Sequence, residues 1–179
     1  MIVYHGSNAI FKKFDASKAR LSQDNFGGGV AYLTGNKNLA ITYAKSMAKR
    51  QGEPIIYTIN ASFRKTFDTE MKFNGKDVLD FIRHVKAEEF AKGAKLLVYG
   101  VDRFTVLDNL KSGMTGLTGK QIFDGLSNGN TQTVKAREIL IKLGYDSLYY
   151  KTPDRVNDVY ITYKDTNIRI EKIERFVKK

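Results

Sequence analysis

The chain has 179 residues, 42% of them hydrophobic, and its 30 lysines and arginines outnumber 19 aspartates and glutamates to give a formal net charge of +11. Chains of this length usually close around one core, so we expect a single domain over residues 1–179. The absence of cysteine excludes disulfides and thiolate metal sites, and two histidines offer little for zinc. The composition predicts a metal-free, cytoplasmic protein.

The positive charge is a second constraint on function. It favours polyanionic partners, either nucleic acid or acidic protein, or a phosphate-bearing cofactor, although a solvated basic surface without a dedicated partner is an equally good interpretation. No DNA-reading motif is visible. Residues 1–4 do not resemble the start of a signal peptide, and no run reaches the roughly 18 apolar residues that span a membrane, so we expect no membrane association.

The first half of the chain predicts strands around one helix. Short apolar runs bounded by glycine or proline indicate strands, and apolar residues three or four apart indicate a helix. Asn36 is a suitable helix cap, and Leu39, Tyr43 and Met47 follow it at helical spacing. In chain order we expect a strand over 1–4 that ends at His5, a glycine loop at 27–29, a strand at 30–34, a helix from 37 that ends before Gly52, a strand at 54–60 and a loop through 73.

The second half predicts mainly helices, followed by strands. An amphipathic helix is expected over 76–92, and the glycine-rich middle predicts short helices joined by turns. We then expect a helix over 131–143 that Gly144 closes, and strands at 146–150, 159–163 and 167–176. Because the strands lie at both ends and the helices mainly between them, the pattern favours an α+β fold over a regular βαβ repeat.

Three segments near the start keep a characteristic order. Residues 5–7 (HGS) end the first strand, residues 26–34 (FGGGVAYLT) join a glycine loop to a strand, and residues 40–44 (AITYA) lie on the next helix. Tyr32 and Tyr43 stand eleven positions apart. Since the glycines lead into a strand rather than into a helix, we do not expect a dinucleotide-binding Rossmann turn.

Together with LGYDSLYY at 143–150 and YITY at 160–163, this order resembles the ADP-ribosyltransferase fold of the H-Y-[E] branch, to which the poly(ADP-ribose) polymerases and diphtheria toxin belong. Small phage-encoded or bacterial members are similar. The resemblance covers both ends of the chain and not its middle, residues 60–130. It implies an ADP-ribosyltransferase-like split, twisted β-sheet core with flanking helices, and NAD as the cofactor.

The resemblance also implies roles for five residues near the start. The rings of Tyr32 and Tyr43 would stack on the cationic nicotinamide, at about 0.5–2 kcal/mol of cation–π attraction per ring. The N–H and C=O of Gly6 would bond the carboxamide, and its missing Cβ would let the ligand approach. His5 would hold a ribose hydroxyl, with Ser7 helping nearby.

The catalytic acid is where this sequence departs from the family pattern. A carboxylate near the sugar stabilises the oxocarbenium-like state left when nicotinamide departs, yet the family's glutamate position falls on Val159. Three interpretations follow: Asp158 serves through a bulge or a shifted register, Asp154 reaches in from the loop at 151–157, or the site lacks an acid. We favour Asp158, followed by Asp154.

The resemblance implies an NAD-dependent mono-ADP-ribosyltransferase, a glycosyltransferase that releases nicotinamide and modifies a macromolecule, with a protein acceptor favoured. A single unit is expected because the missing glutamate is linked in the family to chain elongation. By analogy with phage-encoded members, the protein would be an effector that acts on host components, such as a defence complex, in the host bacterial cytoplasm. With water as the acceptor, it would be a glycohydrolase.

Two other classes of function fit the same residues. One is a non-catalytic module that holds NAD or ADP-ribose, and the other is a basic nucleic-acid-binding module in which His-Gly-Ser is incidental. The residues also have purely structural interpretations: His5 bonded to backbone, Tyr32 and Tyr43 in the core, Asp158 in a turn, and His84 structural or on the surface.

Overall fold

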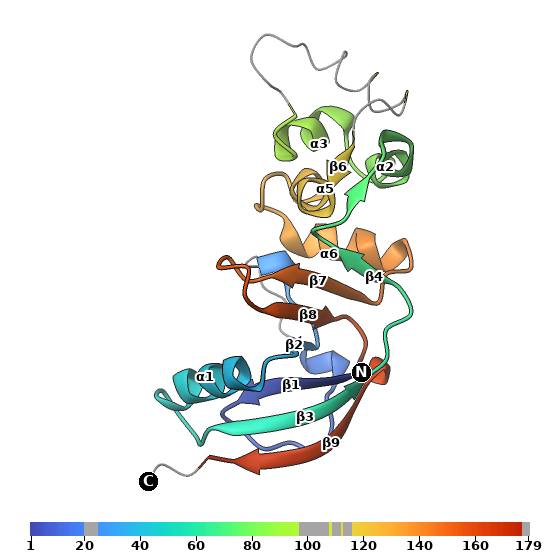
Figure 1. Ribbon diagram of the computed structural model, residues 1–179. Helices are drawn as coiled ribbons and strands as arrows, with labels where there is room; N and C mark the ends of the chain where they lie inside the picture. Colours follow the sequence, from blue (N-terminus) through green and yellow to red (C-terminus); the bar gives the residue numbers. More distant parts are fainter. Residues whose placement is uncertain (20–24, 97–107, 109–111, 113–115, 177–179) are drawn as a thin grey trace. The chain divides into compact units, whose positions relative to one another are not determined.

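The computed structural model describes residues 1–19, 25–96, 108, 112 and 116–176 (Figure 1). The fold is mixed α+β, as the order of the predicted elements indicated, with a large, mostly antiparallel sheet and several helices. Contacts divide the chain into two compact units, one formed by residues 1–20, 29–66 and 146–179 and the other by 21–28 and 67–145. The expectation of one ADP-ribosyltransferase-like domain stays a prediction.

The large sheet places the first strand of the chain in its interior. Among the described residues it has seven strands, in the order β4-β7-β8-β2-β1-β3-β9 (Figure 1). Their bounds are β1 Ile2–Ser7, β2 Ala31–Thr34, β3 Ile55–Ala61, β4 Thr66–Asp68, β7 Ser147–Lys151, β8 Asp158–Thr162 and β9 Ile168–Arg175. The strands predicted near both ends of the chain are confirmed. One boundary was wrong: β1 continues through Ser7, so His5 lies inside the strand rather than at its end.

In the first unit, the two faces of the sheet are covered by different groups of side chains. On one face, which we call the Tyr57 face, the side chains of Val3, Leu33 and Tyr57 join one buried cluster. On the other, which we call the α1 face after the helix α1 (Lys37–Ala48), Ile56 is buried against Ala40 and Ala44. Because side chains alternate along a strand, the register of β1, β2 and β3 puts Gly6 and Tyr32 on the α1 face.

The helix on the α1 face begins where the sequence predicts. α1 spans Lys37–Ala48, and the side chain of Asn36 accepts hydrogen bonds from the backbone N–H of Asn38 (2.9 Å) and of Leu39 (3.3 Å). The buried side differs from the predicted stripe, because α1 packs through Ala40 and Ala44.

The predicted stripe of α1 faces solvent instead. Tyr43 is 52% exposed and Met47 is 43% exposed. The interpretation of Tyr43 as a core residue is therefore wrong.

Close packing of α1 on β1 explains the glycine at position 6. A Cβ on Gly6 would lie 2.1 Å from the carbonyl oxygen of Ala40 and 2.9 Å from the backbone nitrogen of Ala44. Both contacts are with helix backbone, which cannot move aside as a flexible side chain can. The missing side chain thus makes room for α1, whereas the sequence analysis attributed it to the approach of a ligand.

The second unit builds its own core, mainly from helices. Phe67 lies at its centre, with ring centroids 5.8 Å from Phe73, 5.8 Å from Phe81 and 5.3 Å from Tyr145. Its helices are α2 Gly75–Ile82, α3 Ala87–Gly93, α5 Gly119–Leu126 and α6 Thr133–Lys142, and its small sheet pairs β5 Lys72–Phe73 with β6 Leu117–Thr118.

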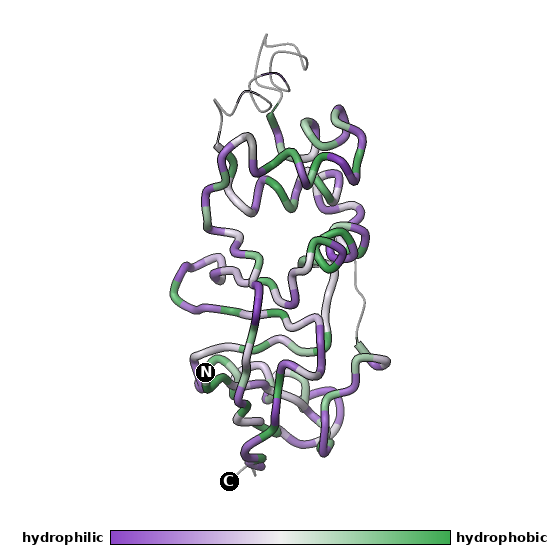
Figure 2. Tube along the Cα trace, turned by 90° about the vertical axis from the view of Figure 1, so that its right-hand side faces the viewer, coloured by the Kyte–Doolittle hydropathy of each residue, from purple (hydrophilic) through white to green (hydrophobic). Residues whose placement is uncertain are grey.

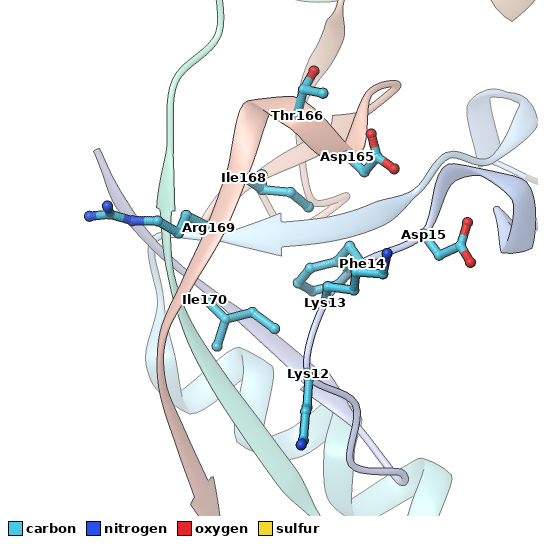
Figure 3. A pocket seen from close by; sticks show the side chains of 9 residues that line it. All are labelled: Lys12, Lys13, Phe14, Asp15, Asp165, Thr166, Ile168, Arg169 and Ile170. Atoms are coloured by element: carbon cyan, nitrogen blue, oxygen red, sulfur yellow. The ribbon is translucent and has the colours of Figure 1, made fainter.

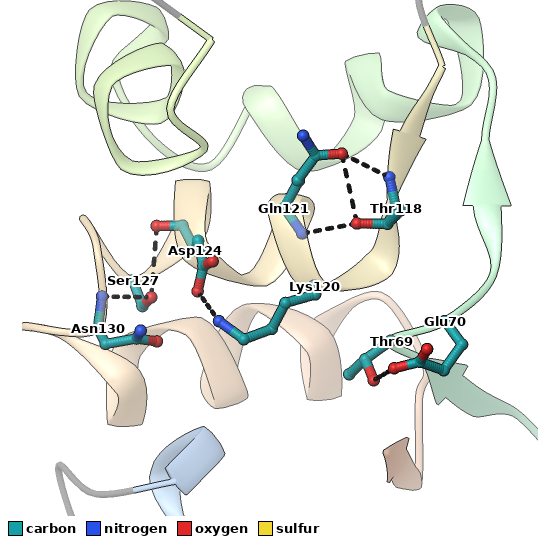
Figure 4. Close-up of polar contacts among 8 residues, drawn as sticks. All are labelled: Thr69, Glu70, Thr118, Lys120, Gln121, Asp124, Ser127 and Asn130. Atoms are coloured by element: carbon teal, nitrogen blue, oxygen red, sulfur yellow. Dashed lines mark hydrogen bonds and ion pairs between the residues drawn. The ribbon is translucent and has the colours of Figure 1, made fainter. Parts of the chain in front are cut away.

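Polar side chains in the second unit mainly stabilise helix ends (Figure 4). Thr118 starts α5 with a capping box: its Oγ1 accepts from the N–H of Gln121 at 3.2 Å, and Gln121 Oε1 accepts from the N–H of Thr118 at 3.0 Å. In the same helix, Lys120 forms an ion pair with Asp124, one turn further along. These contacts are local, and they account for the polar residues of α5 without a ligand.

Two predictions for the middle of the chain were wrong. The loop expected through residue 73 contains β4 and β5, and the helix expected over 76–92 is broken into α2 and α3. Bonds from the N–H of His84 to Phe81 (3.2 Å) and of Val85 to Ile82 (3.1 Å) tighten the end of α2. The helix expected over 131–143 is confirmed as α6, and Gly144 follows it with a φ of +86°. Gly113 lies outside the described residues.

Hydrophobic residues are distributed in short stretches along the trace (Figure 2). Within the part of the chain that the structure describes, no helix is long and apolar enough to cross a membrane.

The packing at Gly6 gives a first test. Gly6→Ala should destabilise the protein by about 1–3 kcal/mol or more, because the added methyl overlaps helix backbone. Gly35→Ala is the matched control, since a Cβ there meets nothing within 4 Å. Urea unfolding of both variants measures the difference, and equal midpoints would show that α1 does not pack on Gly6 as described.

Candidate functional site

The hydrogen bonds of β1 determine which way its backbone groups point. Met1 and Ala61 exchange both backbone bonds, with N···O distances of 2.7 and 2.8 Å, and the register then runs without a shift to Ser7↔Ile55. In an antiparallel ladder such bonded pairs alternate along the strand. The odd-numbered residues of β1 therefore bond β3, and the N–H and C=O of Tyr4 and Gly6 point toward β2.

The ladder between β1 and β2 opens just before it would reach Gly6. Within the described ranges the two strands register at Tyr4↔Thr34 alone, and the next bonded pair would be Gly6 with Tyr32. The carbonyl of Tyr32 instead accepts a hydrogen bond from Nδ1 of His5, at 2.9 Å. As a result, one backbone donor and one backbone acceptor of Gly6 face the opening.

The same hydrogen bond fixes the protonation of His5. A carbonyl only accepts, so Nδ1 carries the proton, and Nε2 is the acceptor of the neutral ring. The ring packs among Phe11, Phe14 and Tyr57, with centroids 6.3, 5.3 and 6.0 Å away. This burial lowers the pKa of His5 below its usual 6.5, although the bond to Tyr32 acts in the opposite direction.

The residues after β1 fold over the Tyr57 face. The hydroxyl of Tyr57 accepts from the N–H of Phe11 at 2.7 Å and donates to the carbonyl of Ala9 at 2.9 Å. Ser7 is buried, and its Oγ accepts from the N–H of Ala9 at 3.2 Å. His5 and Ser7 thus lie with their side chains on the face opposite to that of Tyr32 and Gly6, which differs from the shared site expected for these residues.

Three tyrosines converge on the α1 face. Tyr32 lies half-buried on β2 and Tyr43 lies exposed on α1; their expected stacking on nicotinamide stays a prediction. Tyr150 on β7 joins them: burial raises its pKa, and the nearby phenols of Tyr43 and Tyr32 raise it further. The sequence does not indicate Tyr150 as a site residue, because its face depends on the register between β7 and β8.

The structure separates Asp158 from these tyrosines. β8 pairs with β7 on one side, where Asp158 lies opposite Lys151, and with β2 on the other, where Val159 lies opposite Thr34. Neither ladder has a register shift. Without a bulge, Val159 takes the α1 face, where it is buried, and Asp158 takes the Tyr57 face. The exposed carboxylate of Asp158 accepts a hydrogen bond from the hydroxyl of Tyr149 at 2.7 Å.

Asp154 lies on the loop between β7 and β8. Its Oδ1 accepts from the hydroxyl of Thr152 and from the N–H of Val156 (3.1 Å), and these bonds lower its pKa, so the carboxylate is ionised at neutral pH. The loop is tied to the cap of α1, because Asn36 Nδ2 donates to Asn157 Oδ1 at 2.5 Å.

A surface hollow lies elsewhere on the first unit, between residues 12–15 and 165–170 (Figure 3). Its wall includes Phe14, whose ring contacts His5, but none of the residues expected to bind NAD. The side chains of Lys12 and Arg169 point in different directions (Figure 3), so they do not form a shared anion site. Among the described residues, no cluster of histidine, aspartate and glutamate is suited to hold a metal ion.

Comparison with known proteins identifies the family of this α+β chain. It belongs to the family described as "Protein of unknown function (DUF3990)", which matches residues 1–101. This range contains His5, Gly6, Tyr32 and Tyr43, and it ends before β7 and β8. No curated protein and no solved structure matches the chain.

The lowered pKa of His5 gives a prediction for stability against pH. The unfolded chain binds a proton at His5 near pH 6.5, whereas the folded chain binds it only at lower pH. The free energy of unfolding should therefore fall as pH drops below 6.5, and His5→Gln should reduce this dependence.

Urea unfolding at several pH values between pH 8 and pH 5 measures the effect. His84→Gln is the control, because it keeps His5 and should keep the dependence. An unchanged pH dependence in His5→Gln would contradict the burial of His5 in its neutral form.

Proposed function

We propose that the protein binds NAD at the opening between β1 and β2 and transfers a single ADP-ribose unit from it. The observation that carries the proposal is the backbone of Gly6, whose N–H and C=O both point into this opening. A carboxamide has one flat edge with an N–H donor and a carbonyl acceptor, so it matches such a pair. The opening also supports the finer fold assignment, an ADP-ribosyltransferase-like split sheet.

The surrounding side chains suit a cationic nicotinamide. Tyr32 and Tyr43 offer aromatic faces on the same side of the sheet as Gly6, and each can contribute about 0.5–2 kcal/mol by cation–π attraction. His5, on the opposite face, is held neutral by burial, so it adds no positive charge that would repel the nicotinamide. We assign His5 the task of holding the carbonyl of Tyr32 and thereby keeping the ladder open, in place of the ribose contact first expected.

The transfer reaction needs few groups from the protein. The bond between C1′ of the ribose and the nicotinamide nitrogen breaks, and its electron pair leaves with nicotinamide, which becomes neutral. The acceptor's nucleophile then bonds C1′ and loses its proton. Of the two candidate acids, we assign the stabilising carboxylate to Asp154, since Asp158 faces the other side of β8.

The net charge of +11 supports a protein acceptor with an acidic surface. By analogy with phage-encoded transferases, we extend the proposal to an effector that modifies host proteins in a bacterial cytoplasm.

A second function is favoured by Val159. An apolar, buried residue stands where the family pattern has its glutamate, and this fits a module that holds NAD or ADP-ribose without reacting it. Both functions predict NAD binding, and only the transferase predicts release of nicotinamide.

The experiment that separates them follows nicotinamide release and protein labelling from NAD labelled on the adenylate, in a bacterial lysate. Asp154→Asn should lower both by about 100-fold, because it removes the charge that stabilises the transition state. Asp158→Asn, the matched control on the opposite face, should leave both near wild type.

The other outcomes are equally informative. Binding of NAD without release would identify the non-reacting module. A larger loss in Asp158→Asn than in Asp154→Asn would return the catalytic role to Asp158. Absence of NAD binding would contradict both functions.

A further inference from the structure

Tyr150 is one of two polar residues directly opposite the position that lacks its acid; the other, Thr34, has the shorter side chain. It pairs directly with Val159 across β7 and β8, and Val159 in turn pairs with Thr34 of β2. Directly opposite residues share a face and have Cβ atoms about 4.5–5.5 Å apart. The side chain of Tyr150 is long enough to extend past the short side chain of Val159.

The surroundings of Tyr150 differ from those of its neighbour on β7. The phenols of Tyr43 and Tyr32 are close enough to that of Tyr150 to raise its pKa. Tyr149, the preceding residue, points to the opposite face and donates its hydroxyl to Asp158. One strand therefore presents two tyrosines with separate surroundings.

The place of Tyr150 in the sheet relates it to one part of NAD. Neighbouring strands are about 4.8 Å apart, and the order from Gly6 outward is β1, β2, β8 and β7 (Figure 1). In the site proposed above, the ribose extends from a nicotinamide between Gly6 and Tyr32 toward β8, the strand that follows β2 in this order. A tyrosine hydroxyl there can both donate to and accept from a sugar hydroxyl.

We propose that the hydroxyl of Tyr150 takes the place of the missing carboxylate and hydrogen-bonds the nicotinamide ribose of NAD. This inference rests on the NAD site proposed above and adds a ribose-binding residue to it. The raised pKa of Tyr150 keeps the group neutral, so it orients the sugar without supplying a negative charge. Its contribution is to binding, while stabilisation of the charged sugar is left to Asp154.

The test is calorimetric titration of NAD into the wild type, Tyr150→Phe and Tyr149→Phe. Tyr150→Phe keeps the ring and its packing but removes the hydroxyl, and it should weaken NAD binding about three- to tenfold, the range expected for one neutral hydrogen bond. Tyr149→Phe, on the opposite face, should bind as the wild type does. A parallel titration with nicotinamide alone should be the same in all three proteins, because that ligand has no ribose.

The outcomes distinguish this inference from the proposed function. If the wild type binds NAD and Tyr150→Phe binds it equally well, the inference is overturned and the NAD site stands. An equal loss in both variants, or a loss for nicotinamide alone, would also overturn it, because Tyr150 would then act through the sheet or the aromatic site. If the wild type does not bind NAD, the proposed site itself fails and the role of Tyr150 fails with it.

Discussion

The hydrogen bond from His5 Nδ1 to the carbonyl of Tyr32 occupies the place where the β1–β2 ladder would otherwise continue. A side chain thereby replaces a backbone partner, and the backbone of Gly6 is left facing the opening. Protonation of His5 at Nε2 would leave this bond as it is and would bury a positive charge. The folded protein therefore favours the neutral ring. The proposed binding of NAD depends on this exchange of partners.

The position of α1 is the second constraint. Gly6, Ala40 and Ala44 together let the helix lie directly on β1, and any larger residue at position 6 would meet helix backbone. Packing through two alanines turns Tyr43 outward, where its ring is available to a ligand. On the same face Val159 is apolar and provides no carboxylate. The residues on this face therefore suit a cation that is bound by aromatic rings better than one that is stabilised by a negative charge.

Local signals in the sequence accounted for much of the fold. The cap at Asn36, the stop at Gly144 and the apolar runs near both ends identified α1, α6 and most strands of the large sheet. The short strands β4 and β5 lacked an alternating pattern, and no glycine or proline marks the break between α2 and α3.

Facing directions in the candidate site were harder to predict. That Asp158 faces away from Tyr32 depends on an unshifted register between distant segments, and the sequence contains no local signal for this register. The place of Tyr150 on the same face as Tyr32 could not be predicted, for the same reason. The spacing of Tyr32 and Tyr43 did identify two residues that share a face.

The central claim, that the backbone of Gly6 receives the carboxamide of NAD, is tested most directly by the amide resonance of Gly6 in a nitrogen-15 correlation spectrum. On titration with NAD, the Gly6 amide should shift strongly and exchange more slowly with solvent, while the amide of Gly35 should not change. An unchanged Gly6 resonance at saturating NAD, or changes confined to other parts of the chain, would contradict the account.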